Sequence, residues 1–317
     1  NLHPGRWENC ERLADIAVLP LAARLIRALL RLDSSAATNS AGILLLGESV
    51  LRDLFLFLGC ALLPHVSRYP TSLGGAHFGM GAPIRIDTFF NTSLSFVWLR
   101  SWATMDAETR DAVRRSAMVL VYTGPHFHTP ESMGDALADL RAVFNLTAVA
   151  RGSHYARVPR LTREHAEQGR AEAPPAEPRS HEISPARTAT PTPQRLAWLE
   201  YLPAHFPQQP YGEHHPVHER NCQSVESECP AARCTAHNAS LADGLGEFRR
   251  TMGLRFAAQY GVPVMRAFDR LAALPQEHIG VGLNGELDCR HWCNPGRAMR
   301  TLAESLVEFV ARSESEY

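Results

Sequence analysis

Two short apolar runs place the strongest constraint on the fold of this chain. Residues 43–47 and Met118–Tyr122 are almost continuously apolar, which is typical of strands buried on both faces of a parallel sheet. Helical apolar spacing follows each run, over Val50–Leu63 and again over Ser132–Leu146. Strands that alternate with helices predict an α/β fold in which helices flank a parallel sheet.

Similar patterns extend this prediction along the chain. We expect one or two strands over 84–99, another at Val262–Met265, and helices over 107–116, 243–260 and Ala298–Ala311. The segment Ile16–Leu32 is apolar but carries Arg24, Arg27 and Arg31, which predicts an amphipathic helix packed on the core. It belongs to an N-terminal helical extension over residues 1–40, and a membrane-surface role for it is the alternative.

Residues 164–194 differ from the rest of the chain in composition. Ala, Pro, Glu, Ser, Thr and Arg dominate there, so the stretch cannot bury enough apolar surface to offset its ordering entropy. We expect a disordered insertion on the surface of one domain, because the candidate catalytic residues lie on both sides of it. Residues 1–317 are therefore predicted to form a single catalytic domain.

Charge and composition exclude several classes of function. The formal net charge is −1, so no electrostatic footprint for nucleic acid is visible. All 32 basic residues are Arg, which excludes lysine as a base, a Schiff-base former or a P-loop residue. The sequence has no uncharged apolar window of about 18 residues, so any membrane contact is expected through a segment absent from this chain. A first residue of Asn1 rather than Met suggests a processed or trimmed chain.

The cysteines and glycosylation sequons indicate an oxidising, secretory compartment. Seven cysteines are present, and the odd number leaves at least one thiol free or paired with another chain. The sequons are at Asn91, Asn145 and Asn238. Zinc is an alternative for one cluster, which contains His214, His215, His218, Cys222, Cys229 and Cys234. Its spacing matches no tight Cys-x-x-Cys pattern, so we expect a loop with disulfides and no metal site.

A serine and a distant Asp-x-x-His predict the chemistry. Ser49, in Gly47-Glu48-Ser49, follows the first apolar run at a strand-to-helix turn, where a nucleophile is exposed. His291 can take its proton, and Asp288 can fix the imidazole tautomer and stabilise its charged form. The spacing of Asp288 and His291 lets one short loop deliver both. The prediction is a Ser-His-Asp triad for acyl chemistry.

Four further residues are candidates for binding. Backbone N–H groups at the start of the helix after Ser49, at Val50, can help to hold an oxyanion. Arg52, one turn later, can orient the nucleophile loop or the substrate, or form a structural salt bridge. Gly124 can bring a backbone N–H near the oxyanion, or form a plain turn before a proline. His205 can line a groove for the acceptor.

These segments resemble the PC-esterase group of the GDSL/SGNH superfamily. Gly47-Glu48-Ser49-x-x-Arg52 is similar to its Gly-Asp-Ser-x-x-Arg signature, and Asp288-Cys289-Arg290-His291-Trp292-Cys293-Asn294-Pro295-Gly296 to its Asp-Cys-x-His-Trp-Cys-x-Pro-Gly signature. Segments 89–98, 121–126 and 202–206, with Cys222, also resemble blocks of that group, so the resemblance covers about 40–312 apart from the insertion. The group includes trichome-birefringence-like polysaccharide O-acetyltransferases and the luminal domain of sialate O-acetyltransferases.

The resemblance implies a three-layer SGNH-hydrolase-like fold and an O-acyltransferase with a covalent acyl-Ser49 intermediate. It also implies O-acetyl transfer to a glycan or polysaccharide hydroxyl, in the Golgi lumen or another secretory location. No bound cofactor is expected; an acetyl donor, for which acetyl-CoA is one candidate, is a co-substrate. Three residues depart from the group's pattern, namely Glu48 for Asp, Tyr122 for Asn and Asp53 for Asn, which puts donor and acceptor specificity in question.

Two other functions are compatible with parts of this pattern. A carbohydrate or acetyl esterase would use the same triad, with water in place of the acceptor alcohol. The two activities differ in how the site excludes water, which the sequence does not reveal. A non-catalytic glycan-binding module on an SGNH-like scaffold is the third hypothesis. The presence of Ser49, Asp288 and His291 together argues against it.

Overall fold

The computed structural model describes residues 19–33, 41–68, 83–98, 105–123, 127, 129–149, 195–203, 206–207, 234–235, 247–281, 287–292 and 296–312. The helices are α2 (Leu19–Asp33), α3 (Ser49–Leu62), α4 (Ala107–Arg115), α5 (Pro130–Val143), α7 (Glu247–Tyr260), α8 (Phe268–Ala272) and α9 (Arg297–Arg312), with short 3₁₀ turns at Leu63–His65 and Pro275–Glu277. The strands are β1 (Ala41–Gly47), β2 (Val66–Arg68), β3 (Ile84–Thr88), β4 (Thr92–Trp98), β5 (Met118–Val121), β6 (Arg195–Leu199), β7 (Phe206–Pro207), β8 (Cys234–Thr235), β9 (Val264–Met265), β10 (His278–Val281) and β11 (Leu287–Trp292).

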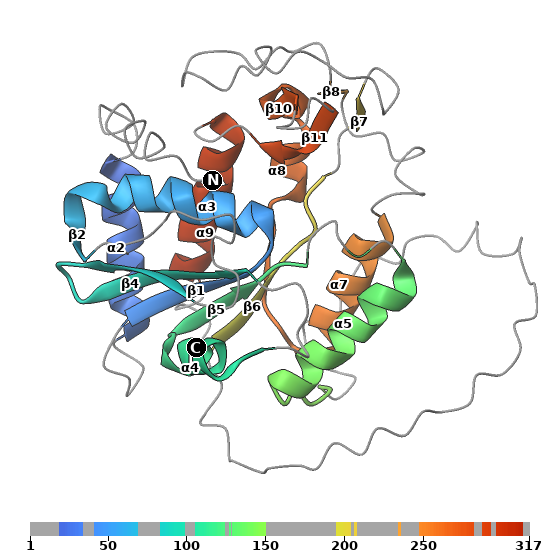
Figure 1. Ribbon diagram of the computed structural model, residues 1–317, viewed down its shortest axis with the longest axis horizontal. Coiled ribbons are helices and arrows are strands. Elements are labelled where there is room, and N and C mark those ends of the chain that lie inside the picture. Colours follow the sequence, from blue (N-terminus) through green and yellow to red (C-terminus); the bar gives the residue numbers. More distant parts are fainter. Residues whose placement is uncertain are drawn as a thin grey trace, which may run out of the picture.

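Seven strands form the main sheet, in the order β2-β3-β4-β1-β5-β6-β9. The five strands from β4 to β9 are mutually parallel, whereas β3 and β2 continue the sheet in antiparallel pairs. Helices cover both faces of the sheet (Figure 1). The predicted α/β fold with a parallel sheet flanked by helices is therefore confirmed.

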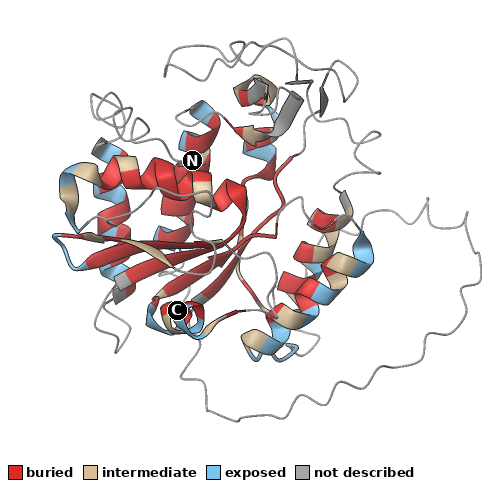
Figure 2. Ribbon diagram, in the orientation of Figure 1, coloured by how far each residue is buried: buried red, intermediate tan, exposed pale blue. Residues whose placement is uncertain are grey.

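The side chains of β1 point alternately into two separate cores. Ile43 and Leu45 pack with α2, α3 and α9, whereas Leu44 and Leu46 pack with α4, α5 and α7. All four are fully buried, and Figure 2 shows the central strands buried along their length. A strand covered on both sides has no polar face, which is why this run is continuously apolar.

Helix α2 is an integral part of one helical layer. Leu21, Leu25, Leu29 and Leu32 are buried in the same core as α3 and α9, while its arginines are exposed. The amphipathic helix predicted over Ile16–Leu32 is thus confirmed for Leu19–Asp33. None of the helices within the described ranges is long and apolar enough to cross a membrane.

The start of one helix differs from the expected one because of local capping. The helix expected over Ser132–Leu146 begins at Pro130, since the Thr129 side chain accepts a hydrogen bond from the Ser132 N–H and caps it. The expectation of one or two strands over 84–99 is confirmed for residues 84–98, which form a hairpin of β3 and β4 with Asn91 at the tip in the left-handed region at φ 57°. Asparagine tolerates this conformation better than most residues.

The prediction that one short loop carries Asp288 and His291 is wrong. Residues Leu287–Trp292 form strand β11, paired with β10 in an antiparallel ribbon. The register shifts between His278, opposite Trp292, and Gly280, opposite Asp288, so that β11 bulges. A bulge bends a strand and redirects its side chains, so a paired strand can serve where a loop was expected.

The proposed insertion at 164–194 lies outside the described residues.

Candidate active site

The candidate site lies at the carboxyl end of β1, where the chain connections on the two sides of this strand leave the sheet in different directions. Strand β1 leads through α3 toward β4 on one side, and its other neighbour in the sheet is β5. In open α/β sheets, ligands bind outside the carboxyl ends of the strands at such a switch point. Ser49 follows the carboxyl end of β1, and Tyr122 that of β5.

Ser49 is the first residue of α3, reached through an extended Glu48. The turn requires a glycine before it, because a Cβ on Gly47 would lie 2.4 Å from the Tyr122 carbonyl oxygen. This close approach holds the end of β1 against the end of β5, where the Tyr122 N–H donates to the Leu46 carbonyl at 3.1 Å. Ser49 is only 3% exposed, so the expectation that this turn exposes the nucleophile is wrong: the surrounding residues bury it.

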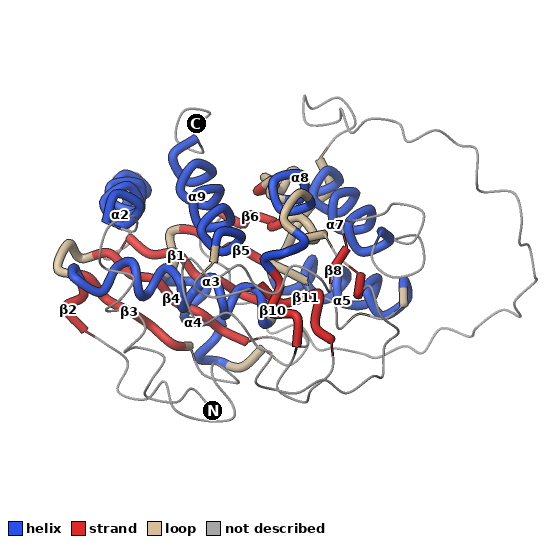
Figure 3. Tube along the Cα trace, turned by 90° about the horizontal axis from the view of Figure 1, so that it is seen from above, coloured by secondary structure: helices blue, strands red, loops and turns tan. Residues whose placement is uncertain are grey.

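His291 lies next to Ser49, 242 residues apart in sequence. The distance between His291 Nε2 and Ser49 Oγ is 2.7 Å, within the range for direct proton transfer. The ribbon of β10 and β11 lies beside α3 when the molecule is seen from above (Figure 3). The structure thus brings the predicted nucleophile and base into contact.

A second histidine supports the strand that carries His291. The His278 Nδ1 atom is 2.9 Å from the His291 carbonyl oxygen, and the His278 ring stacks on Trp292 at 3.9 Å between centroids. His278 and Trp292 are both 2% exposed. His278 was missed in the sequence because it lies outside the motif; its pairing opposite Trp292 becomes visible only in the sheet. Asp288 lies in β11, but its side chain is outside the described ones, so its contact with His291 stays a prediction.

The start of α3 offers positive potential at the Ser49 hydroxyl. The first helical hydrogen bond runs from the Arg52 N–H to the Glu48 carbonyl at 3.1 Å, so the N–H groups of Ser49 and Val50 have no partner within the helix. Such groups, together with the helix dipole, favour negative charge at this end. They are suitable donors for an oxyanion that forms beside Ser49.

Two tyrosines and an arginine lie along the ends of β5 and β6. The Tyr122 and Tyr201 rings stack with centroids 6.2 Å apart, and the Arg249 guanidinium lies 5.6 Å from the Tyr201 ring centre. Burial, then the Tyr201 phenol and the Glu48 carboxylate, raise the pKa of Tyr122 well above 10.0. Tyr122 therefore stays neutral over the whole physiological pH range.

Arg52 makes the structural salt bridge considered as one alternative. Its guanidinium donates to the Asp53 carboxylate at 2.8 and 2.9 Å, and it lies 5.4 Å from the Trp98 ring centre. Trp98 ends β4 opposite Gly47, so Arg52 and Trp98 lie on the side of β1 away from β5. The contacts hold Arg52 in place, and a role in orienting substrate stays a prediction.

Several of the other residues singled out in the sequence are not among those that the structure describes. Gly124, His205 and the histidines at 214, 215 and 218 lie outside the described residues. Cys60 in α3 is in a disulfide bond. Within the residues that the structure describes, no three His, Cys, Asp or Glu side chains gather as a metal would need.

In comparisons with known proteins, no protein-family model and no curated protein matches this chain.

Proposed function

We propose that this protein is an O-acyltransferase that moves an acetyl group through Ser49 to a glycan hydroxyl. The observation that carries the proposal is the 2.7 Å contact between Ser49 Oγ and His291 Nε2, at the carboxyl end of a parallel sheet. A serine hydroxyl is a poor nucleophile at neutral pH unless an adjacent base takes its proton. The contact supplies that base.

The reaction proceeds in two halves. His291 takes the Ser49 proton as Ser49 Oγ attacks the acetyl carbonyl, the N–H groups at the start of α3 stabilise the oxyanion, and the leaving group takes the proton from His291. In the second half, His291 deprotonates the acceptor hydroxyl, which attacks the acetyl-Ser49 ester, and Ser49 Oγ takes this proton from His291 as it leaves. Asp288 orients His291 and stabilises its charged form.

The finer features of the proposal come from the resemblance. The two signatures support membership of the PC-esterase group and a three-layer SGNH-like architecture. An acetyl donor such as acetyl-CoA would load Ser49, and a polysaccharide would unload it. The disulfide at Cys60 and the three sequons support a location in the secretory pathway, since disulfides persist in oxidising compartments.

The test is detection of the covalent intermediate. We incubate the protein with acetyl-CoA, and separately with p-nitrophenyl acetate, and search by mass spectrometry for an acetylated Ser49 peptide. The adduct should form, should be absent in Ser49→Ala, and should disappear faster when a polysaccharide acceptor is added. Rapid hydrolysis that no acceptor redirects would show an esterase instead. A folded protein that neither forms the adduct nor turns over any ester, yet binds glycans, would contradict catalysis altogether.

A further inference from the structure

A groove lined with arginines lies between α2 and α9, apart from the catalytic serine. Its volume is about 460 Å³, in the range of ligand sites. The residues that line it are Arg24, Arg27, Ala28, Arg31, Val307, Glu308, Ala311 and Arg312. Among the described residues that line it are four arginines and one glutamate, although the whole chain has a formal net charge of −1. Arginines therefore outnumber carboxylates among the described residues of the groove.

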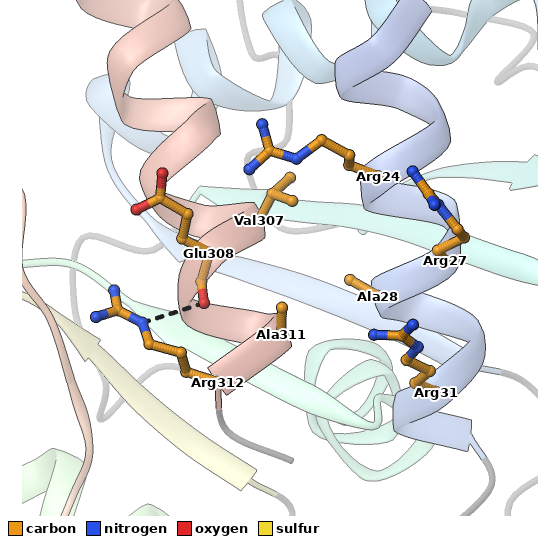
Figure 4. Close-up of a pocket in the computed structure, with 8 residues that line it drawn as sticks. All are labelled: Arg24, Arg27, Ala28, Arg31, Val307, Glu308, Ala311 and Arg312. Atoms are coloured by element: carbon orange, nitrogen blue, oxygen red, sulfur yellow. Dashed lines mark hydrogen bonds between the residues drawn. The ribbon is translucent and has the colours of Figure 1, made fainter. Parts of the chain in front are cut away.

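The α2 arginines form a linear array along the groove. Arg24, Arg27 and Arg31 line the groove from α2, and Figure 4 shows the Arg24 side chain reaching from α2 toward α9. At 1.5 Å per residue, the array extends about 10 Å along the helix axis. An array of this length fits a chain with repeated negative charges better than a single compact anion.

Internal hydrogen bonds position two of the guanidinium groups. Arg27 Nε donates to the Ala23 carbonyl at 3.2 Å, and Arg312 Nε donates to the Glu308 carbonyl at 3.3 Å. The Glu308 carboxylate is itself held by Arg270 at 2.8 Å, so an arginine outside the groove offsets its charge. Guanidinium groups recognise carboxylate and sulfate oxygens through paired, charge-assisted hydrogen bonds.

We propose that this α2–α9 groove binds an acidic polysaccharide, one that carries carboxylate or sulfate groups, and so holds the acceptor of the proposed transferase. The inference rests on the proposed function for the identity of the acceptor. Val307 lies ten residues, or about 15 Å, along α9 from the end nearest β11, so only a polymer spans both sites. The apolar floor of Ala28, Val307 and Ala311 suits the C–H faces of sugar rings, and the arginines suit their acidic substituents.

The test compares two matched triple variants of the whole chain. Arg24→Gln/Arg27→Gln/Arg31→Gln removes the array, and Arg110→Gln/Arg114→Gln/Arg115→Gln removes three exposed charges from α4 as the control. The first should weaken binding of polygalacturonate about tenfold or more, and the control less than about twofold. Dextran, which is neutral, should bind neither. In acetyl transfer to polygalacturonate, the array variant should raise the acceptor KM and leave kcat unchanged.

Hydrogen exchange of the wild-type protein gives a readout that needs no variant. Polygalacturonate should protect the amides of α2 and of the last turns of α9. Unchanged polygalacturonate affinity in the array variant would overturn the inference. So would phosphatidylserine vesicles or single-stranded DNA that displace polygalacturonate from the groove.

Detection of acyl-Ser49 in the wild type, set beside polygalacturonate binding, separates this inference from the proposed function. If polygalacturonate binds in an array-dependent way while no acyl-Ser49 forms in the wild type, the groove stands as a binding site and the transferase proposal fails. If acyl-Ser49 forms while the array variant binds and uses polygalacturonate normally, the groove proposal alone fails.

Discussion

At the scale of single residues, the contact between Ser49 and His291 makes two side chains act as one unit. Ser49→Ala and His291→Ala should each lower kcat/KM for an acetyl ester by about 10³-fold or more, because each removes the same proton-transfer step. The double variant should be no slower than either single variant. Initial rates measure this, with His65→Ala, beyond the far end of α3, as the control. Losses that multiply in the double variant would show that the two residues act independently.

Tyr122 predicts a loss of stability at alkaline pH. Its pKa is raised in the folded state, mainly by burial, so its contribution is complete below the pKa of an unfolded tyrosine, near 10, and is lost as the pH rises toward the folded value. The chain has no lysine to titrate in this range. As the pH rises from 9 to 11, the free energy of unfolding should therefore fall more in the wild type than in Tyr122→Phe. Denaturant unfolding at each pH measures this. Parallel pH curves for the two proteins would contradict the assignment.

The sequence revealed those residues whose role depends on a local pattern. Ser49 follows an apolar run and precedes a helical one, and His291 stands in a specific motif, so both were predictable. His278 and Tyr201 were not, because His278 acts through its register opposite Trp292 and Tyr201 through stacking across neighbouring strands. Such contacts join residues that are far apart in the sequence, and no helical or strand-like pattern of apolar residues connects them.

At the scale of elements, one carboxylate, that of Asp106, caps the start of α4. The Asp106 side chain accepts a hydrogen bond from the Thr109 N–H at 2.6 Å, and this bond is the main cause of its lowered pKa. Asp106→Ala should cost about 0.5–2 kcal/mol in the free energy of unfolding, whereas Asp106→Asn, also a good cap, should cost little. Denaturant unfolding at pH 7 measures both.

The same cap has a pH dependence with a defined sign. Because the folded pKa of Asp106 is lowered, its contribution is complete above the unfolded value near 3.8 and is lost as the pH falls through the folded pKa. An asparagine cap does not titrate, so Asp106→Asn should lose less stability than the wild type between pH 5 and 3. An equal loss in both proteins would mean that the charge of Asp106 contributes nothing.

Elements with a strong apolar period were predictable, and short ones were not. Strand β1 and helices α3 and α9 agree with their patterns within one or two residues at most ends. Strand β11 was expected as a loop, because Asp288, Arg290 and His291 give no strand-like alternation. It is a strand because β10 pairs with it, and that pairing joins segments whose own preference is weak.

At the scale of the whole molecule, the order of the strands determines where the site lies. The apolar runs predicted a parallel sheet, but their order depends on pairing between distant segments, such as β1 placed between β4 and β5. The site follows from that order, since Gly47, two residues before Ser49, lies against Tyr122 only because β1 and β5 are neighbours. Composition does not encode such neighbours, so the site had to be predicted from motifs instead.

The two cores should unfold together because one strand carries both. Leu45 and Leu46 are fully buried on opposite faces of β1, in the separate cores beneath the two helical layers. Leu45→Ala and Leu46→Ala should each cost about 2–5 kcal/mol through the cavity that they leave. Leu30→Ala, at a residue 42% exposed, should cost less than about 0.5 kcal/mol as the control. Loss of either layer exposes the sheet face that it covered, and the same strands also carry the other core. Tryptophan fluorescence and far-ultraviolet circular dichroism should therefore report one coincident transition in every variant. Two separated transitions in either core variant would mean that the helical layers fold as independent units and that the single-domain prediction is wrong.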